Sequence, residues 1–334
     1  MTSDDKQVID HAIEHAAGFI KRQLIAGNYS LSVCGSDGTT RFSDQKGHVF
    51  VGFYITEALV GLLNEIERTI ILVRIITEER DGKWGFSPGA LWVSPEHESF
   101  VVDADDTAYV LRTLRLLGVF RSPESLMQFF REPTRAFVTF AAKGALTNHG
   151  TLTDQPNFAN NMAFHPEVNA NVFLMLKGTP FESAINFDVI AEQQSEDGSW
   201  KSYFYPGHYF ANPLFLSFLS SIDWYRPHIE KTIAFLHGHQ NSDGSWGATG
   251  NNYETALALK GLAAAGRFDD SYRRGINFLL QSVDSTGGWS DREVVIWEYH
   301  DQNNDIWRAF DHHGTLVTSM AVAALRDWSK HLSG

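Results

Sequence analysis

Apolar residues recur every three to four positions along most of the chain, which is the spacing of one face of an α-helix. This pattern predicts about twelve helices, at residues 5–25, 48–64, 66–79, 105–118, 123–143, 168–178, 182–195, 209–222, 226–240, 252–265, 269–283 and 313–329. No segment alternates convincingly enough to predict a β-strand. Two long loops remain, roughly residues 26–47 and 284–312, both rich in Gly, Asp, Asn and aromatic residues. Loops of that length within a compact domain are usually functional or mobile.

A short motif follows several of the predicted helices. Residues 194–200 read Gln-Ser-Glu-Asp-Gly-Ser-Trp, residues 240–247 read Gln-Asn-Ser-Asp-Gly-Ser-Trp-Gly, and weaker copies end at Trp84 and Trp289. The last three of these tryptophans are 46 and 43 residues apart, a period typical of helix-pair arrays. Asp-Gly provides a turn after a helix end, the Gln can bond a neighbouring helix end, and the Trp offers a large surface to the next repeat.

The repeats therefore predict an all-α fold, an (α/α)6 double helical barrel with six inner helices inside six outer ones. No low-complexity linker divides the chain, so we expect a single domain over residues 1–334. We expect the four repeat tryptophans to pack between successive outer helices, namely Trp84, Trp200, Trp246 and Trp289.

Composition limits the function classes. A formal net charge of −13 leaves no basic surplus to neutralise phosphates, so nucleic acid is not an expected partner. A single cysteine, Cys34, excludes an internal disulfide framework and a multi-cysteine zinc site. The first residues are acidic and no apolar run follows them, so no signal peptide is readable, and no segment is apolar enough to cross a membrane. The expectation is a soluble, cytoplasmic protein.

An acidic motif, Asp103-Ala104-Asp105-Asp106-Thr107, precedes the fourth predicted helix. Acidic residues in that position most often cap the helix and interact with the positive end of its dipole. A metal site is a weaker interpretation, because no partner cluster of ligands accompanies the three carboxylates.

The acidic motif combined with the Gln-to-Trp repeats resembles the class II terpene cyclases, the group of squalene–hopene cyclases and protonation-initiated diterpene cyclases. Residues 167–173, Glu-Val-Asn-Ala-Asn-Val-Phe, are similar to that family's segment Asp-Val-Thr-Ala-His-Val-Leu. The similarity covers roughly residues 75–329. Family members normally carry a second helical barrel, for which this chain is too short, so it resembles an isolated catalytic-type barrel.

The resemblance implies a reaction and its residues. The chain would cyclise a linear isoprenoid by protonating an alkene, with Asp105 as the proton donor because it matches the middle Asp of the family motif. Asp103 would orient Asp105 or share its proton, and Asp106 would be partly structural. Asn171 stands where the family has His, and would hydrogen-bond the acid.

The chemistry makes demands on the acid and on the cavity. An ordinary Asp has a pKa near 3.9 and is ionised at neutral pH, so burial and neighbouring carboxylates must raise the pKa of Asp105. The carbocation then needs a dry, aromatic-lined cavity. Packing is the commoner role for any single aromatic residue; the substrate-binding candidates are Trp92, Phe164, His208, Tyr209, Trp297, Trp307, Phe310 and His313.

The partners follow from the same resemblance. The expected substrate is a hydrophobic isoprenoid, farnesyl-sized by inference from the chain's length, with or without a diphosphate. No cofactor is required, and Mg²⁺ would enter only with a diphosphate substrate. The two long loops, with Phe42, Trp297, Trp307 and Phe310, would cover the cavity in place of the second barrel. A homodimer is the alternative means of closure.

Three other classes of protein share parts of this pattern. Protein prenyltransferase β-subunits share the barrel type but hold zinc through Asp, Cys and His, which Cys34 alone cannot assemble. A carbohydrate-active α/α barrel would use acidic pairs but would not explain the repeats. The third alternative, a non-catalytic barrel that binds an isoprenoid or a protein, is compatible with the sequence. Convergence of Asp103, Asp105 and Asn171 within hydrogen-bonding distance in apolar surroundings would favour the cyclase.

Overall fold

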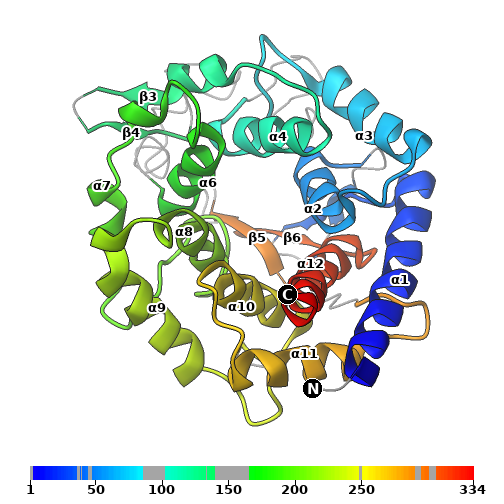
Figure 1. Ribbon diagram of the computed structural model, residues 1–334. Coiled ribbons are helices and arrows are strands. Elements are labelled where there is room, and N and C mark those ends of the chain that lie inside the picture. The colour runs from blue at the N-terminus through cyan, green and yellow to red at the C-terminus, as the bar shows by residue number, and fades with distance from the viewer. Residues whose placement is uncertain are drawn as a thin grey trace.

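The computed structural model describes residues 3–35, 38, 40–43, 47–85, 102–132, 134–139, 165–247, 250–289, 295–300 and 306–334. Its fold is mostly helical, as the periodicity predicts. Six helices lie around a common centre (Figure 1): α2 (Val49–Leu59), α4 (Ala104–Leu116), α6 (Pro166–Leu176), α8 (Ala211–Leu219), α10 (Asn252–Ala264) and α12 (Thr315–Ser333). Each contacts the next, and α12 contacts α2.

A second set of helices lies outside the first (Figure 1): α1 (Ser3–Ala26), α3 (Glu65–Glu78), the 3-10 helix η1 (Pro123–Phe129), α7 (Asp188–Ala191), α9 (Arg226–Gly238) and α11 (Asp270–Ser282). The two sets differ in burial. Nearly all of α2 is buried, whereas α11 buries one stripe that includes Tyr272, Ile276 and Leu279. A spacing of three to four residues places these side chains on one face. Inner helices such as α2 are thus buried on all faces, whereas outer helices such as α11 are buried only on the face toward the inner set.

The repeat tryptophans link the two sets. Trp84, Trp200, Trp246 and Trp289 are all buried, with at most 1% of each exposed. The indole of Trp246 donates to the carbonyl of Leu236 at the end of α9, and a Cβ on Gly275 of α11 would lie 2.6 Å from its ring. Trp246 therefore packs between successive outer helices, as the repeat predicts.

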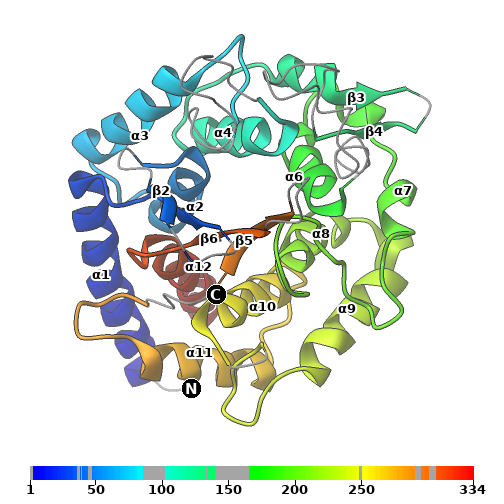
Figure 2. The same ribbon diagram turned by 180° about the vertical axis from the view of Figure 1, so that it is seen from behind.

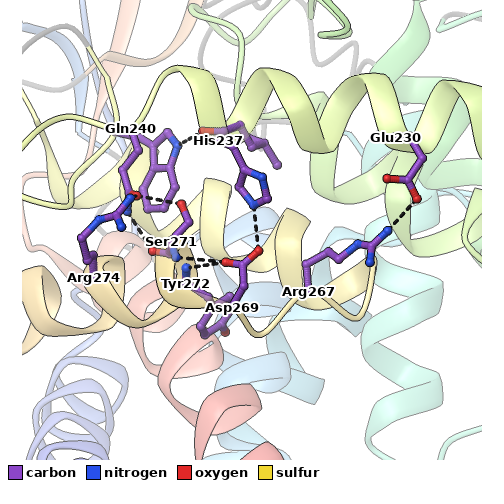
Figure 3. A network of polar contacts seen from close by, with 10 residues as sticks. Glu230, His237, Gln240, Arg267, Asp269, Ser271, Tyr272 and Arg274 are labelled. Carbon is purple, nitrogen blue, oxygen red and sulfur yellow. Dashed lines mark hydrogen bonds and ion pairs between the residues drawn. The ribbon is translucent and has the colours of Figure 1, made fainter.

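The glutamine and Asp-Gly positions of the same repeat also act as predicted. Gln240 Nε2 donates to the carbonyls of Gly244 and Ser271, which joins the end of α9 to the start of α11 (Figure 3). Asp269 caps α11 by accepting from two backbone amides and also contacts His237 at 2.9 Å. Gly244 has φ = 92°, and a Cβ there would lie 2.6 Å from the carbonyl oxygen of Arg274. Only glycine fits this turn.

The two long loops form a sheet, so the expectation that the chain lacks strands was wrong. Strands β1 (Ser32–Cys34), β2 (Thr40–Ser43), β5 (Val295–His300) and β6 (Ile306–Phe310) pair antiparallel in the order β2-β1-β6-β5. The strands are short, and the β1–β6 pairing joins opposite ends of the chain, so no local pattern reveals it. β6 leads directly into α12, and Figure 2 shows the sheet across one end of the inner helices.

Two predicted helices were also wrong. The segment 123–143 contains η1 followed by strands β3 (Phe130–Arg131) and β4 (Ala136–Phe137), which pair antiparallel. Proline, residue 133 in the sequence, disfavours a continuous helix, and Arg135 has φ = 51°. The segment 182–195 contains only the 3-10 turn η3 (Glu182–Ala184) and the four residues of α7, because Ile185 is extended. A further 3-10 turn, η4 (Asp223–Tyr225), precedes α9.

Helices long and apolar enough to cross a lipid bilayer do not occur in the described parts of the chain.

Candidate active site

The acidic motif begins α4, and its first carboxylate caps the helix. Asp103 Oδ1 accepts from the backbone amide of Asp106 at 2.7 Å. The Asp103 amide donates to the carbonyl of Trp84 at 2.9 Å, and the Trp84 amide donates to Thr107 Oγ1 at 3.0 Å. The first repeat tryptophan thus fixes the position of the motif. The capping interpretation is correct for Asp103, but it does not account for the other two carboxylates.

The Asp105 carboxyl group meets side chains from two other segments. Asn171 Nδ2, on α6, donates to Asp105 Oδ1 at 2.8 Å and to the Asp105 carbonyl at 3.0 Å. The hydroxyl of Tyr205, in the segment before α8, donates to Asp105 Oδ2 at 3.2 Å. Asp105 is 8% exposed and Asn171 is fully buried. The hydrogen bond expected between Asn171 and Asp105 is therefore present.

Burial raises the pKa of Asp105 well above its ordinary value, and the negative charge of Asp103 raises it further. The hydrogen bonds from Asn171 and Tyr205 act in the opposite direction. Burial, Asp103 and Asp105 also raise the pKa of Asp106, whose Oδ1 has no hydrogen-bond partner among the described residues. Like charges this close do not all ionise. The site therefore favours neutral Asp105 and Asp106 beside the capping carboxylate.

Aromatic rings pack around Tyr205, whose hydroxyl reaches the Asp105 carboxyl group. The Tyr205 ring stacks on Phe210 with centroids 3.5 Å apart, and on Phe50 of α2 at 5.8 Å. Phe50 also meets Tyr109 edge-on at 5.1 Å, and the hydroxyls of Tyr109 and Tyr54 lie 3.2 Å apart. These π faces can stabilise a nearby positive charge.

A second buried carboxylate holds the segment that carries Tyr205. Glu167 Oε1 accepts from the backbone amides of Tyr203 at 2.7 Å and Phe204 at 3.0 Å. Burial raises the pKa of Glu167 to about 7, and its Oε2 has no hydrogen-bond partner within the described segments. The Phe204 carbonyl accepts from the amide of Glu298 in β5 at 2.9 Å. The sheet is thereby joined to the end of the ring where Asp105 lies.

The proposed substrate-binding residues lie in different surroundings. Trp297 is buried and stacks on Phe204 at 6.5 Å, which places it near the acid's supporting segment. His208 contacts Ser199 Oγ at 3.2 Å, and the Tyr209 ring lies 5.9 Å from Phe235 on α9, so both contact the outer layer. Phe310 is partly buried on β6 and His313 is exposed. The remaining candidates lie outside the described residues or side chains: Trp92, Phe164, Trp307 and, among the expected lid residues, Phe42.

Sequence reasoning missed three contributors. Tyr205 was not distinguished from the other aromatic residues, Glu167 was noted only within the matched segment 167–173, and Arg112 was not considered. Arg112 lies seven residues after Asp105 on the same helix and donates to Asn171 Oδ1 at 2.5 Å. Seven residues are about two helical turns, so the two residues share a face of α4. That spacing was the available signal.

Within the described residues no group of three or more His, Cys, Asp or Glu side chains is arranged to hold a metal ion.

Comparison with known proteins finds matches to the squalene–hopene cyclases, each over part of the chain. The model of the squalene–hopene cyclase C-terminal domain matches residues 145–299. A curated squalene–hopene cyclase from Zymomonas mobilis is 28% identical over 162 residues, which cover 43% of this chain and 24% of that protein. The matched part is thus about a quarter of the relative's length.

Solved structures extend the similarity to nearly the whole chain. The type II terpene cyclase MstE from Scytonema, in complex with its substrate geranylgeranyl dihydroxybenzoate, matches with a TM-score of 0.75 and 17% identity over 99% of each chain. A protein geranylgeranyltransferase-I from Candida albicans matches with a TM-score of 0.58 and 12% identity over 95% of this chain and 91% of its own. The fold is that of these α/α barrel structures, and the resemblance to the class II terpene cyclases is confirmed.

Proposed function

We propose that this chain is a class II terpene cyclase, a single (α/α)6 barrel domain that cyclises a linear isoprenoid by protonation. The observation that carries the proposal is the Asp105 carboxyl group. It is buried, its pKa is raised, and both oxygens accept hydrogen bonds, from Asn171 and Tyr205. A raised pKa keeps the proton on the acid at neutral pH, and preorganised donors stabilise the carboxylate after the proton leaves.

In the proposed reaction, the Asp105 proton goes to one carbon of a terminal alkene and leaves a tertiary carbocation on the other. Further alkenes of the same chain attack this cation and form the rings. Loss of a proton, or addition of water, ends the reaction, and Asp105 regains a proton for the next turnover. The aromatic rings of Phe50, Tyr205 and Phe210 next to the acid suit a cationic intermediate.

The substrate is an isoprenoid of undetermined length. MstE, whose chain this one matches over 99% of its length, was solved with a geranylgeranyl substrate that carries an aromatic acid. We therefore extend the substrate class from farnesyl-sized chains to geranylgeranyl chains with a diphosphate or an aromatic head group. Mg²⁺ would be needed only by a diphosphate. The sheet formed by the two long loops, with Trp297, is the proposed cover of the cavity.

The geometry bears on the alternatives. Asp105 and Asn171 converge in aromatic surroundings, which favours a cyclase over a binding barrel whose acidic motif only caps a helix. Asp103 caps α4, and its negative charge also raises the pKa of Asp105. A carbohydrate-active site would need two carboxylates facing a sugar, whereas Glu167 accepts from backbone amides.

The test is incubation of the purified protein with farnesyl diphosphate, geranylgeranyl diphosphate, squalene and geranylgeranyl dihydroxybenzoate, followed by mass spectrometry of the products. We expect cyclic isomers or their hydrates from at least one substrate. The Asp105→Asn variant should fold and make none, because an amide cannot protonate an alkene. Wild-type turnover by correctly folded Asp105→Asn would refute the assignment of the acid.

A further inference from the structure

Arg112 lies behind the acid's hydrogen-bond partner. Its guanidinium donates to Asn171 Oδ1 at 2.5 Å, while Asn171 Nδ2 donates to Asp105. The Asn171 side chain on α6 thus connects two side chains of α4, Arg112 and Asp105. The guanidinium carbon also sits 4.4 Å from the centroid of the Phe53 ring, which fixes the arginine from the side.

This chain of contacts determines which way the Asn171 amide faces. An amide has an acceptor oxygen and a donor nitrogen, and guanidinium is a donor only. If the amide were reversed, its NH₂ would face the guanidinium and its oxygen would face the Asp105 carboxyl oxygen. The guanidinium would then meet a donor, the Asp105 backbone carbonyl would lose the 3.0 Å bond that it accepts from Asn171, and Asn171 is too buried for water to replace these bonds. Arg112 therefore selects the orientation in which Asn171 donates to Asp105.

Arg112 is also available to act on the acid electrostatically. It lines a cavity of about 520 Å³ together with Glu57, Lys260 and Asp327. Glu57 forms its close ion pair with Lys260, at 2.6 Å, and in the described parts of the chain Arg112 has no carboxylate within ion-pair distance. The groups that act most strongly on Asp105 itself are Asp103, Glu167, Asn171 and Tyr205. Asp106, Tyr109 and Tyr54 also interact with its charge. Arg112 is thus the cation linked to the acid by hydrogen bonds.

We propose that Arg112 is a positioning residue for the acid: it holds the Asn171 amide as a donor to Asp105 and contributes positive charge that stabilises the Asp105 carboxylate. The expected effect of Arg112 on kcat rests on the proposed function. Its effects on the orientation of Asn171 and on the pKa of Asp105 do not. Guanidinium stays protonated at all relevant pH values, so the orientation of Asn171 is set independently of pH. Removal of Arg112 makes Asp105 a weaker acid.

The test compares Arg112→Met with Arg115→Met. Methionine retains much of the stem that packs on Phe53 but has no charge and no donor. Arg115 is a matched control, since it also joins α4 to α6, through a 2.9 Å bond to the carbonyl of Met175, without touching Asn171. An Arg112→Lys variant keeps the charge and one donor group.

The first measurement needs no substrate. Infrared titration of the carboxyl groups, with the Asp105 signal assigned by its loss in Asp105→Asn, should show the Asp105 titration at higher pH in Arg112→Met and unchanged in Arg115→Met. Arg112→Lys should lie between wild type and Arg112→Met. Equal titrations in wild type and Arg112→Met would overturn the proposal.

The second measurement is kinetic. Arg112→Met should lower kcat about ten- to hundredfold with KM changed less than about threefold, and the decline of kcat at high pH should move upward with the Asp105 titration. A change confined to KM would make Arg112 a binding residue and overturn the proposal. If no substrate is turned over but the titration shifts, the proposed function fails and the positioning role of Arg112 stands.

Discussion

Replacing Asn171 by alanine removes the shorter of the two hydrogen bonds to the Asp105 carboxyl group. The bond is 2.8 Å long and buried, so its value to the carboxylate is that of a hydrogen bond to a charged group, roughly 1.5–3 kcal/mol. The bond strengthens as Asp105 loses its proton, because the acceptor becomes charged. The loss should therefore appear in the transition state, as a fall in kcat of about ten- to hundredfold with little change in KM.

The variant also loses stability, and a control separates the two effects. Asn169, two residues away on α6, is equally buried, but its side chain bonds to the backbone of Phe137 instead of to the acid. Asn169→Ala should lower the midpoint of urea unfolding about as much as Asn171→Ala does. Its kcat, measured per folded molecule under conditions where both variants are folded, should stay near the wild-type value. Equal kcat values for the two variants, or an effect of Asn171→Ala on KM alone, would refute the reasoning.

Two further predictions concern stability. Burial raises the pKa of Glu167 from 4.5 to about 7, so the folded state binds more protons than the unfolded state in this range and loses stability as pH rises, by about 3 kcal/mol in total. Urea unfolding of Glu167→Gln should lack that part of the decline between about pH 4.5 and 7; an identical pH dependence in both proteins would contradict it. Gly244→Ala places a Cβ 2.6 Å from the Arg274 carbonyl at φ = 92° and should lower the Tm markedly. Gly266→Ala, at φ = 68° with no atom within 4 Å, carries only the left-handed backbone cost of roughly 1–2 kcal/mol, and the prediction fails if the two Tm values fall equally.

The repeats made the helical layers predictable because their chemistry is local. The two full copies place a glutamine, a turn glycine and a tryptophan within seven residues. Their glutamine bonds recur, because Gln194 Nε2 donates to the carbonyls of Gly198 and His228 as Gln240 Nε2 does to those of Gly244 and Ser271. The Trp246 amide donates to Thr255 Oγ1 at 3.0 Å, as the Trp84 amide does to Thr107 and the Trp289 amide to Thr318. A threonine near the start of an inner helix is thus a further element of the repeat that the sequence pattern did not reveal.

The sheet could not be predicted for the opposite reason. β1 has three residues, and its partner β6 lies more than 270 residues later. Neither strand is long enough to show an alternating pattern, and pairing between such distant segments is decided by the fold that brings them together. The aromatic residues of the loops indicated that the loops have a function, but they did not indicate that the loops form a sheet.

At the site, the motif predicted that Asp105 and Asn171 are in contact. It did not predict which residues orient them. The Asp105–Asn171 contact followed from the resemblance. Glu167 accepts from the backbone amide of Tyr203, and Arg112 donates to the side-chain amide of Asn171. No motif marks either contact in the sequence. The helical spacing of seven residues between Asp105 and Arg112 becomes meaningful only once α6 is known to lie against α4.

The distance of Arg112 from the acid resolves a conflict in what the reaction requires. The acid must be protonated before the reaction and stable as a carboxylate afterwards. A cation about 4 Å from Asp105 would interact with its charge by about 4 kcal/mol at an effective dielectric constant near 20, and this would offset the burial that keeps the proton in place. The Asn171 amide separates the two groups by one hydrogen bond on each side, which places the charges roughly 7 Å apart, where the same interaction is about 2.4 kcal/mol. Arg112 can therefore aid the carboxylate through the Asn171 amide while burial still keeps Asp105 protonated, whereas a cation in direct contact would leave the acid ionised at rest.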